Sequence, residues 1–128
     1  MTESQLTELQ LAILEVLWEH AEASVQTIHA SLADSRGLAL STVATVVGRL
    51  EKKGVLSRRN VGRTFLYSAA IDRRDVQKEK LRDLTRTVFG DDKKALMAHL
   101  VQPGALSVDE LAYVRELLDR AEQEARDE

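Results

Sequence analysis

Residues 41–54, STVATVVGRLEKKG, carry two side-chain patterns at once. At the helical spacing of about 100° per residue, apolar side chains gather on one face and short polar or cationic side chains on its neighbour. The many β-branched residues leave a strand as an alternative, but a half-buried strand needs a strict alternation that is absent here. A helix with two stripes is therefore favoured. The apolar stripe comprises Val43, Val46, Val47 and Leu50, and the polar stripe comprises Thr42, Thr45, Arg49 and Lys53.

Both ends of this helix have sequence signals. Ser41 is predicted to cap the N-terminus with its hydroxyl group. Gly54 suits the left-handed position that often follows the last residue of a helix. The helix is thus expected to run from about residue 41 to about residue 53.

Two amphipathic segments precede this helix. Thr7 and Gln10 form a capping-box pattern at the start of a first helix, which ends near Trp18. Ser24 is the predicted cap of a second, short helix, which is expected to stop before a loop-like cluster at residues 34–37. The chain is therefore expected to begin with three consecutive helices.

A hairpin is predicted after the third helix. The sequence VLSRRNVGRTFLY, residues 55–67, has β-formers on both sides of a segment in which Gly62 can adopt a positive φ. Strands are predicted near residues 55–59 and 64–68, with cationic residues around the loop between them.

Beyond the hairpin, the sequence is helical again. Asp72 can cap a helix that ends at Gly90, and a short helix follows at about residues 92–101. Ser107 opens the last helix with a second capping box, and the charged tail at residues 122–128 is expected to fray.

Composition excludes several kinds of site. None of the 128 residues is cysteine, so disulfides, thiolate metal sites and a cysteine nucleophile are excluded. The three histidines lie at no metal-ligand spacing and no catalytic motif is visible, so the chain is predicted to be no enzyme and to need no metal or other cofactor. The N-terminus does not resemble a signal peptide, and no apolar run approaches the roughly 20 residues that span a bilayer. These features predict a soluble, cytoplasmic protein without membrane insertion.

Charge is distributed unevenly along the chain. The net charge is −3, but residues 36–67 carry seven cations and one anion, whereas the remainder carries 11 cations and 20 anions. A cationic block on an otherwise acidic chain favours contact with a polyanion at one place. The alternative is an ordinary solvated surface.

The order helix, helix, helix, hairpin is that of a winged helix-turn-helix, whose third helix enters the DNA major groove while the hairpin, or wing, lies along the backbone. Arg49 would then contact a guanine or a phosphate. Arg58, Arg59 and Arg63 would contact phosphates or a minor groove, or alternatively protect an exposed strand edge. Two other functions stay open: a protein-interaction module, and a winged-helix regulator that senses a small molecule. DNA binding would weaken log-linearly with salt, and protein interaction would not.

Three stretches of the sequence resemble one known family. LTELQLAILEVLWEH (residues 6–20), TVATVVGRLEKKGVL (residues 42–56) and GRTFLYSAAID (residues 62–72) are similar to the penicillinase-repressor family of BlaI, MecI and CopY type. The resemblance covers nearly the whole chain. It implies a homodimeric repressor that binds a palindromic operator through an N-terminal winged helix and dimerises through a C-terminal three-helix module. By motif match, it assigns the family's recognition-helix positions to Thr42, Thr45 and Arg49 and its wing position to Arg63.

The sequence also departs from this family. Members often begin the third helix with Pro-Lys, where this chain has Leu40 and Ser41. The loss of the lysine suggests a different operator or a weaker phosphate contact. In the antibiotic-responsive branch, a membrane sensor system triggers cleavage of an Asn-Phe bond, and the corresponding residues here are His99 and Leu100. An upstream membrane sensor protease is thus a further partner that the resemblance implies, although the cleavage motif is changed. The cysteine-rich motif of the copper branch is absent.

The sequence therefore predicts a mainly α protein, with a winged helix-turn-helix DNA-binding domain and a small two-stranded hairpin in residues 1–70 and a helical dimerisation domain in residues 71–128. Double-stranded operator DNA and a second copy of the chain are the predicted partners. The second copy is predicted because short C-terminal helices with few aromatic residues bury little surface alone. The predicted DNA-binding residues are Ser41, Thr42, Thr45, Arg49, Lys53, Arg58, Arg59 and Arg63. The predicted dimerisation residues are Leu81, Leu84, Val88, Leu96, Leu100, Leu111, Val114, Leu117 and Leu118.

Overall fold

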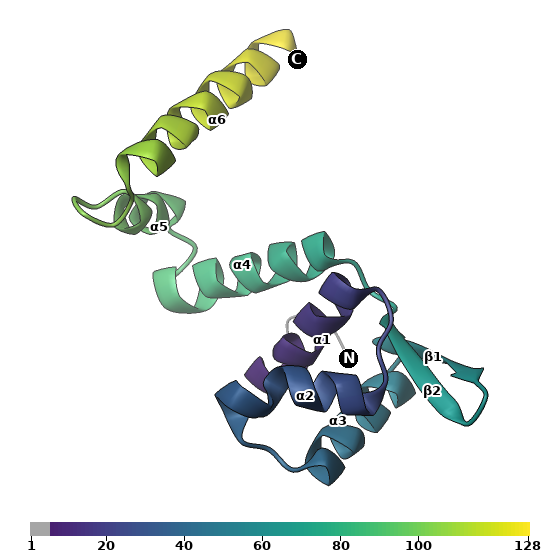
Figure 1. The fold of residues 1–128 in the computed structure, drawn as a ribbon. Coiled ribbons are helices and arrows are strands. Elements are labelled where there is room, and N and C mark those ends of the chain that lie inside the picture. Colours follow the sequence, from purple (N-terminus) through teal and green to yellow (C-terminus); the bar gives the residue numbers. More distant parts are fainter. Residues whose placement is uncertain (1–5) are drawn as a thin grey trace. The chain divides into compact units, whose positions relative to one another are not determined.

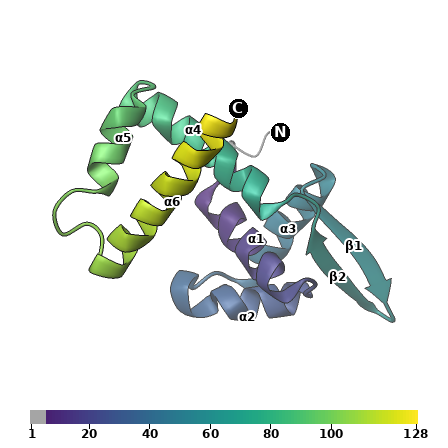
Figure 2. The same cartoon turned by 90° about the horizontal axis from the view of Figure 1, so that it is seen from above.

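The N-terminal part of the chain is a group of three helices followed by a hairpin. A computed structural model describes residues 6–128, except for the side chains of residues 34–36. The two strands are antiparallel and form a sheet of their own, and the hairpin projects beyond the helices (Figure 1, Figure 2). The predicted winged-helix order is confirmed. Its elements are α1 (Glu8–His20), α2 (Val25–Arg36), α3 (Leu40–Lys52), β1 (Leu56–Val61) and β2 (Thr64–Ala69).

Three further helices follow the hairpin. They are α4 (Arg73–Phe89), α5 (Lys93–Leu100) and α6 (Val108–Asp127). Contacts within the chain group it into two compact units, one that ends at Leu81 and one that spans Arg82–Glu128. The first half of α4 therefore belongs to the winged-helix unit, and its second half belongs with α5 and α6. The predicted boundary between residues 70 and 71 stays a prediction.

The core of the winged-helix unit is aliphatic. Three of the four residues in the predicted apolar stripe of α3 are fully buried, and Val46 is half-buried against the same core. Tyr67 of β2 and Val76 of α4 are also buried there. Each fully buried aliphatic side chain stabilises the fold by about 1.5–3 kcal/mol relative to its exposed state. The largest fully buried side chains are Ile13, Leu14, Leu17, Ile28, Val43, Val47 and Leu50.

Three predicted N-terminal caps are confirmed. Thr7 and Gln10 form a complete capping box at α1, in which each side chain accepts a hydrogen bond from the other's backbone N–H (3.2 and 3.0 Å). Ser107 forms the same arrangement with Glu110 at α6. Ser24 accepts from the Thr27 N–H at the start of α2. These caps are local, and a spacing of three residues in the sequence was enough to predict them.

The cap predicted at Ser41 is wrong. α3 begins at Leu40, and Ala39 occupies the N-cap position without a side-chain hydrogen bond. His29 Nε2 donates to the carbonyl of Leu38, two residues before α3, at 2.7 Å. Ser41 therefore lies in the first turn of the helix, where its side chain is exposed.

Two helices extend further than predicted. α2 continues through residues 34–36 and ends at Gly37, which has a φ of 59° and donates its N–H to the Ala33 carbonyl at 3.0 Å. A left-handed glycine of this kind is a common end of a helix. α6 continues to Asp127, so the predicted fraying of residues 122–128 is wrong. Ion pairs from a glutamate to the arginine four residues later, at 3.7 and 3.9 Å, support this helix.

The hairpin is also longer than predicted. Its strands pair up to a two-residue turn formed by Gly62 and Arg63. Gly62 has a φ of 62°, and a positive φ at the first central residue gives the turn a twist that matches the strands. Arg58 and Arg59 lie within β1, inside the strand predicted near residues 55–59, and Arg63 lies at the tip of the wing.

A strained turn joins α1 to α2. Ala21 has a φ of 65° and a ψ of −53°, and the Glu22 N–H donates to the His20 carbonyl at 2.7 Å. These angles and this hydrogen bond define a three-residue γ-turn with positive φ, which is rare and strained for residues other than glycine. The turn places Glu22 and Ala23 beside the wing, as described below.

We expect Ala21→Gly to raise the free energy of unfolding by up to about 1 kcal/mol, because relief of a strain of about 1–2 kcal/mol outweighs the entropy of about 0.5–1 kcal/mol that glycine adds to the unfolded chain. Denaturant titration followed by circular dichroism measures the change. Ala30→Gly, at an exposed position inside α2, is the matched control and should destabilise by about 1 kcal/mol. Equal destabilisation by the two substitutions would show that the turn stores no strain.

Candidate nucleic-acid interface

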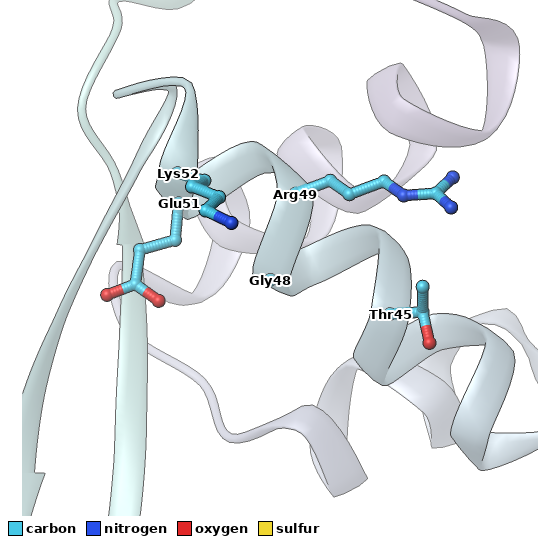
Figure 3. A pocket seen from close by; sticks show the side chains of 5 residues that line it. All are labelled: Thr45, Gly48, Arg49, Glu51 and Lys52. Carbon is cyan, nitrogen blue, oxygen red and sulfur yellow. The ribbon is translucent and has the colours of Figure 1, made fainter.

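The polar stripe of α3 faces solvent. Thr42, Thr45, Arg49 and Lys53 are all exposed, whereas Val43 and Val47 on the neighbouring face are fully buried. Figure 3 shows the Arg49 side chain extending away from the helix, with Thr45 one turn before it. The two stripes predicted from the sequence therefore have opposite environments, and only the polar stripe is available to a partner.

A shallow depression lies on this exposed side of α3. Its volume is about 570 Å³, and it is lined by Thr45, Gly48, Arg49, Glu51 and Lys52 (Figure 3). A Cβ atom added at Gly48 would meet nothing within 4 Å, so the glycine leaves open space at this point of the helix. Glycine inside a helix costs about 0.5–1 kcal/mol relative to alanine, and one use of such a position is close approach of a partner to the backbone.

The Thr45 side chain has a defined orientation. Its hydroxyl group donates to the Ser41 carbonyl at 2.9 Å, one turn earlier in the same helix. This bond holds the threonine in one rotamer although the residue is exposed. Ser41 therefore contributes to the surface through its backbone as well as through its exposed side chain.

Two of the three predicted wing arginines form ion pairs within the protein. Arg58 Nε lies 3.0 Å from Glu51 of α3, and its guanidinium group lies over the Phe65 ring, 4.1 Å from the ring centroid. Arg59 forms a bidentate ion pair with Glu22, in which Nε donates to Oε2 at 2.6 Å and Nη2 donates to Oε1 at 2.8 Å. These contacts occupy the two guanidinium groups in the unbound chain.

Hydrogen bonds from the Arg59 guanidinium lower the pKa of Glu22 below its ordinary value, and the same hydrogen bonds raise the pKa of Arg59. Both groups are therefore charged at neutral pH.

Three predicted cations have no such partner. Within the described side chains, no ion pair involves Arg49, Lys53 or Arg63. Arg49 lies on α3, Lys53 is the C-cap residue directly after α3, and Arg63 lies at the wing tip. All three are exposed. Unpaired exposed cations are the groups that can replace the counterions of a phosphate backbone.

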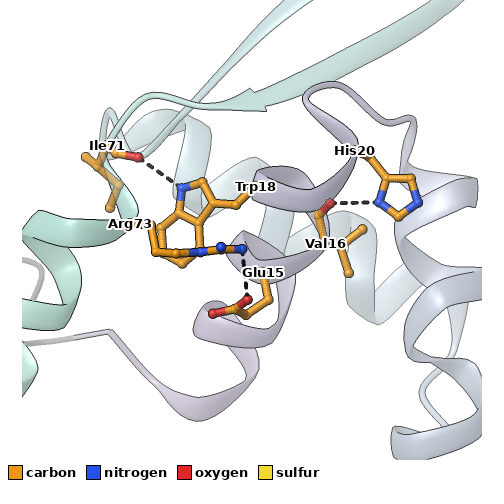
Figure 4. A network of polar contacts seen from close by, with 6 residues as sticks. All are labelled: Glu15, Val16, Trp18, His20, Ile71 and Arg73. Atoms are coloured by element: carbon orange, nitrogen blue, oxygen red, sulfur yellow. Dashed lines mark hydrogen bonds and ion pairs between the residues drawn. The ribbon is translucent and has the colours of Figure 1, made fainter. Parts of the chain in front are cut away.

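A network around Trp18 fixes the end of the wing against α1 (Figure 4). Trp18 Nε1 donates to the Ile71 carbonyl at 3.1 Å, just after β2. The Arg73 guanidinium lies 5.4 Å from the centroid of the Trp18 ring and pairs with Glu15 at 3.3 Å. The segment between the wing and α4 is thus held to the first helix.

These features are those of a winged-helix unit with an exposed polar helix face and a basic wing. The model of the penicillinase repressor family matches residues 6–120. The chain belongs to the penicillinase repressor family. Because the members of this family are repressors, the prediction that the chain is not an enzyme is confirmed.

Individual penicillinase repressors resemble the chain over most of its length. The penicillinase repressor of Bacillus licheniformis is 23% identical over 115 residues, which cover 90% of each protein. The methicillin resistance regulatory protein MecI of Mammaliicoccus sciuri is 22% identical over 116 residues, or 91% of this chain and 94% of MecI. A solution structure of Bacillus licheniformis BlaI, in monomeric form with the blaP half-operator, is 28% identical with a TM-score of 0.51 and covers 58% of this chain and 90% of that one.

The C-terminal helices of this family member present apolar side chains to solvent. α6 has no buried residue, and Leu117 and Leu118 are 42% and 54% exposed. Of the nine predicted dimerisation residues, only Leu96 and Val114 are half-buried. Further exposed apolar residues, outside the predicted dimerisation set, are Met97, Val101, Val108 and Tyr113. No helix within residues 6–128 is both long and apolar enough to cross a membrane.

Sequence reasoning missed the residue that pairs with Arg59 of the wing, Glu22. It lies outside the basic segment, and 37 positions separate it from Arg59. No local motif signals such a pair, because the contact depends on how the α1–α2 turn meets the wing. The sequence showed a lone acidic residue after the first helix and nothing more.

Proposed function

We propose that the chain is a sequence-specific DNA-binding transcriptional repressor that acts as a homodimer on a palindromic operator. α3 would enter the major groove, with Ser41, Thr42, Thr45 and Arg49 facing base edges or phosphates. Lys53 and Arg63 would contact the backbone. Arg58 and Arg59 remain candidates for contact, subject to the ion pairs that hold them. The cytoplasm is the compartment in which such a repressor would act.

The observation that carries this proposal is the division of α3 into a buried valine face and an exposed threonine and arginine face. A helix buried on one side and lined with short polar residues and an arginine on the other has the shape and chemistry to read a major groove. The family supports the same reading, since BlaI from Bacillus licheniformis forms a complex with its half-operator.

The exposed apolar residues of α6 support the dimer. Large apolar side chains are exposed between Val108 and Leu118 of α6, and a second copy of the chain would cover them. A two-fold dimer places its recognition helices about one helical turn of DNA, roughly 34 Å, apart. The winged helix would thus serve DNA binding in residues 1–70, and the helices of residues 71–128 would serve dimerisation. The proposal includes no cleavage by a membrane sensor protease, because His99 and Leu100 depart from the Asn-Phe pattern.

We expect duplex DNA selected from fragments of the source genome to contain a two-fold symmetric motif and to bind with a strong dependence on salt. The logarithm of the association constant should fall linearly with the logarithm of salt concentration, with a slope of about −0.9 for each phosphate contact. Fluorescence anisotropy over a salt series measures this slope. A protein-interaction module would instead show no selected motif and no salt-dependent binding of DNA.

A further inference from the structure

The wing is attached to the α1–α2 turn by one side-chain contact, here called the Glu22–Arg59 brace. The carboxylate and guanidinium groups meet through two parallel hydrogen bonds of 2.6 and 2.8 Å. This bidentate geometry fixes the relative orientation of the two groups as well as their distance. The brace thus constrains the direction in which β1 leaves the helices.

Backbone hydrogen bonds lie next to this brace. The Ala23 N–H donates to the Tyr67 carbonyl at 3.0 Å, and the Tyr67 N–H donates to the Ala23 carbonyl at 2.9 Å. Ala23 therefore adds a single antiparallel pair to the outer edge of β2. The strained γ-turn at Ala21 directs the chain into this position. Strained backbone persists where the surrounding structure fixes it, and it is frequent at functional sites.

The wing is held on both faces. Neighbouring residues of a strand project to opposite faces, so Arg58 and Arg59 lie on different sides of β1. Arg58 contacts Glu51 of α3 and Arg59 contacts Glu22 of the α1–α2 turn. The wing is consequently held both to α3 and to the turn between α1 and α2.

An exposed ion pair of this kind contributes little to the free energy of unfolding, because water screens both charges. Its effect on binding has a different origin. A wing that already has its bound orientation loses less conformational entropy when it meets a partner, and affinity rises accordingly. The brace is therefore better suited to orient the wing than to stabilise the fold.

We propose that Glu22 is a positioning residue for DNA binding, which holds Arg59 and thereby orients the wing so that Arg63 reaches the DNA backbone. This inference rests on the proposed function of the chain as a DNA-binding repressor. It assigns Arg59 to the support of the wing rather than to direct phosphate contact. Glu22, an anion in the winged-helix unit, would then promote the binding of a polyanion.

The sign of the effect of Glu22→Gln separates this role from simple electrostatics. If Arg59 contacts a phosphate, Glu22 competes for it, and its removal should tighten binding and steepen the salt slope. If the brace orients the wing, Glu22→Gln should weaken binding by about threefold to tenfold, in the lower part of the range of coupling within one ion-pair network, with the salt slope unchanged. The two roles predict opposite changes in affinity.

The experiment compares the full chain with Glu22→Gln, Arg59→Gln and the double variant. The probe is a duplex of about 30 base pairs, three helical turns, selected from a random-sequence library. Glu19→Gln is the matched control, since it removes the same charge from an exposed position three residues earlier. It should leave binding equal or slightly tighter. The losses of binding free energy from the two brace substitutions should be non-additive. The double variant should then bind DNA no more weakly than the single variant with the lower affinity. Faster hydrogen exchange of the Tyr67 amide in Glu22→Gln would report loosening of the wing.

Tighter or unchanged binding by Glu22→Gln would overturn the inference, and so would losses that multiply in the double variant. Exchanging the two charges, Glu22→Arg with Arg59→Glu, should recover most of the affinity lost by either single change and guards against a folding defect in one variant. If the selection yielded no duplex that the unmodified chain binds, the proposed function itself would be contradicted. The two failures are thus distinct.

Discussion

Leu117→Asp is expected to convert the proposed dimer to a monomer. Leu117 is 42% exposed on α6, in the apolar stripe that also contains Leu111 and Leu118. An unpaired carboxylate within an apolar interface is destabilising by at least about 3 kcal/mol, which corresponds to more than a hundredfold increase in the dimer dissociation constant. Sedimentation velocity over a concentration series measures this change. Loss of the dimer should also weaken binding to a two-fold symmetric operator, because each monomer then binds a half-site alone.

Gln123→Asp is the control for this substitution. At about 100° per residue, position 123 lies on the opposite side of α6 from the apolar stripe. The substitution adds the same charge to the same helix, and the dimer should persist. If Leu117→Asp also left the dimer intact, the interface would have to lie elsewhere in the chain.

Arg49→Ala should weaken operator binding by about 1–3 kcal/mol, or roughly 5- to 150-fold, with the fold intact. Arg49 is exposed on the polar stripe of α3, extends away from the helix in Figure 3, and has no ion-pair partner among the described side chains. Because its side chain contributes nothing to the buried core, thermal unfolding should be unchanged. Anisotropy titrations with operator and non-operator duplexes measure the effect.

Arg49→Lys separates two roles of this arginine. Lysine keeps the positive charge but lacks the bidentate hydrogen bonds that a guanidinium group can donate to guanine. If Arg49 reads a guanine, the lysine variant should lose operator affinity and retain non-operator affinity. If it contacts a phosphate, both affinities should be nearly preserved. Arg115→Ala, on α6, removes the same charge outside the winged-helix unit and should have little effect. Equal affinity of Arg49→Ala and the unmodified chain for the operator would exclude Arg49 from the interface.

Local patterns predicted most of the fold. The capping boxes at Thr7 and Ser107 and the positive φ of Gly62 each depend on residues at most three positions apart, and each was recognisable in the sequence. The two stripes of α3 were predictable for the same reason, because helical periodicity alone determines which residues share a face. Fold class and family were predicted together by these signals and by the motifs that resemble the family.

Long-range contacts account for what the sequence did not reveal. Ser41 looked like a cap, but α3 begins one residue earlier, at Leu40, after a segment whose Leu38 carbonyl accepts a hydrogen bond from His29. Arg58 and Arg59 looked alike as wing cations, yet each is held by a carboxylate from a different element. Sequence periodicity gives the face on which a residue lies, but it does not give the partner that the tertiary fold brings to that face.

In the proposed DNA complex, the hydrogen bond from Thr45 to the Ser41 carbonyl would restrict what this threonine recognises. Its only hydroxyl hydrogen is already used, so toward a base the oxygen can act solely as an acceptor. With α3 in a major groove, Thr45 would favour the amino groups of adenine or cytosine over the keto oxygens of guanine and thymine, while its methyl group could still pack against the thymine methyl. A side chain that offers both hydrogen-bonding options when free would thus become selective through a contact within its own helix.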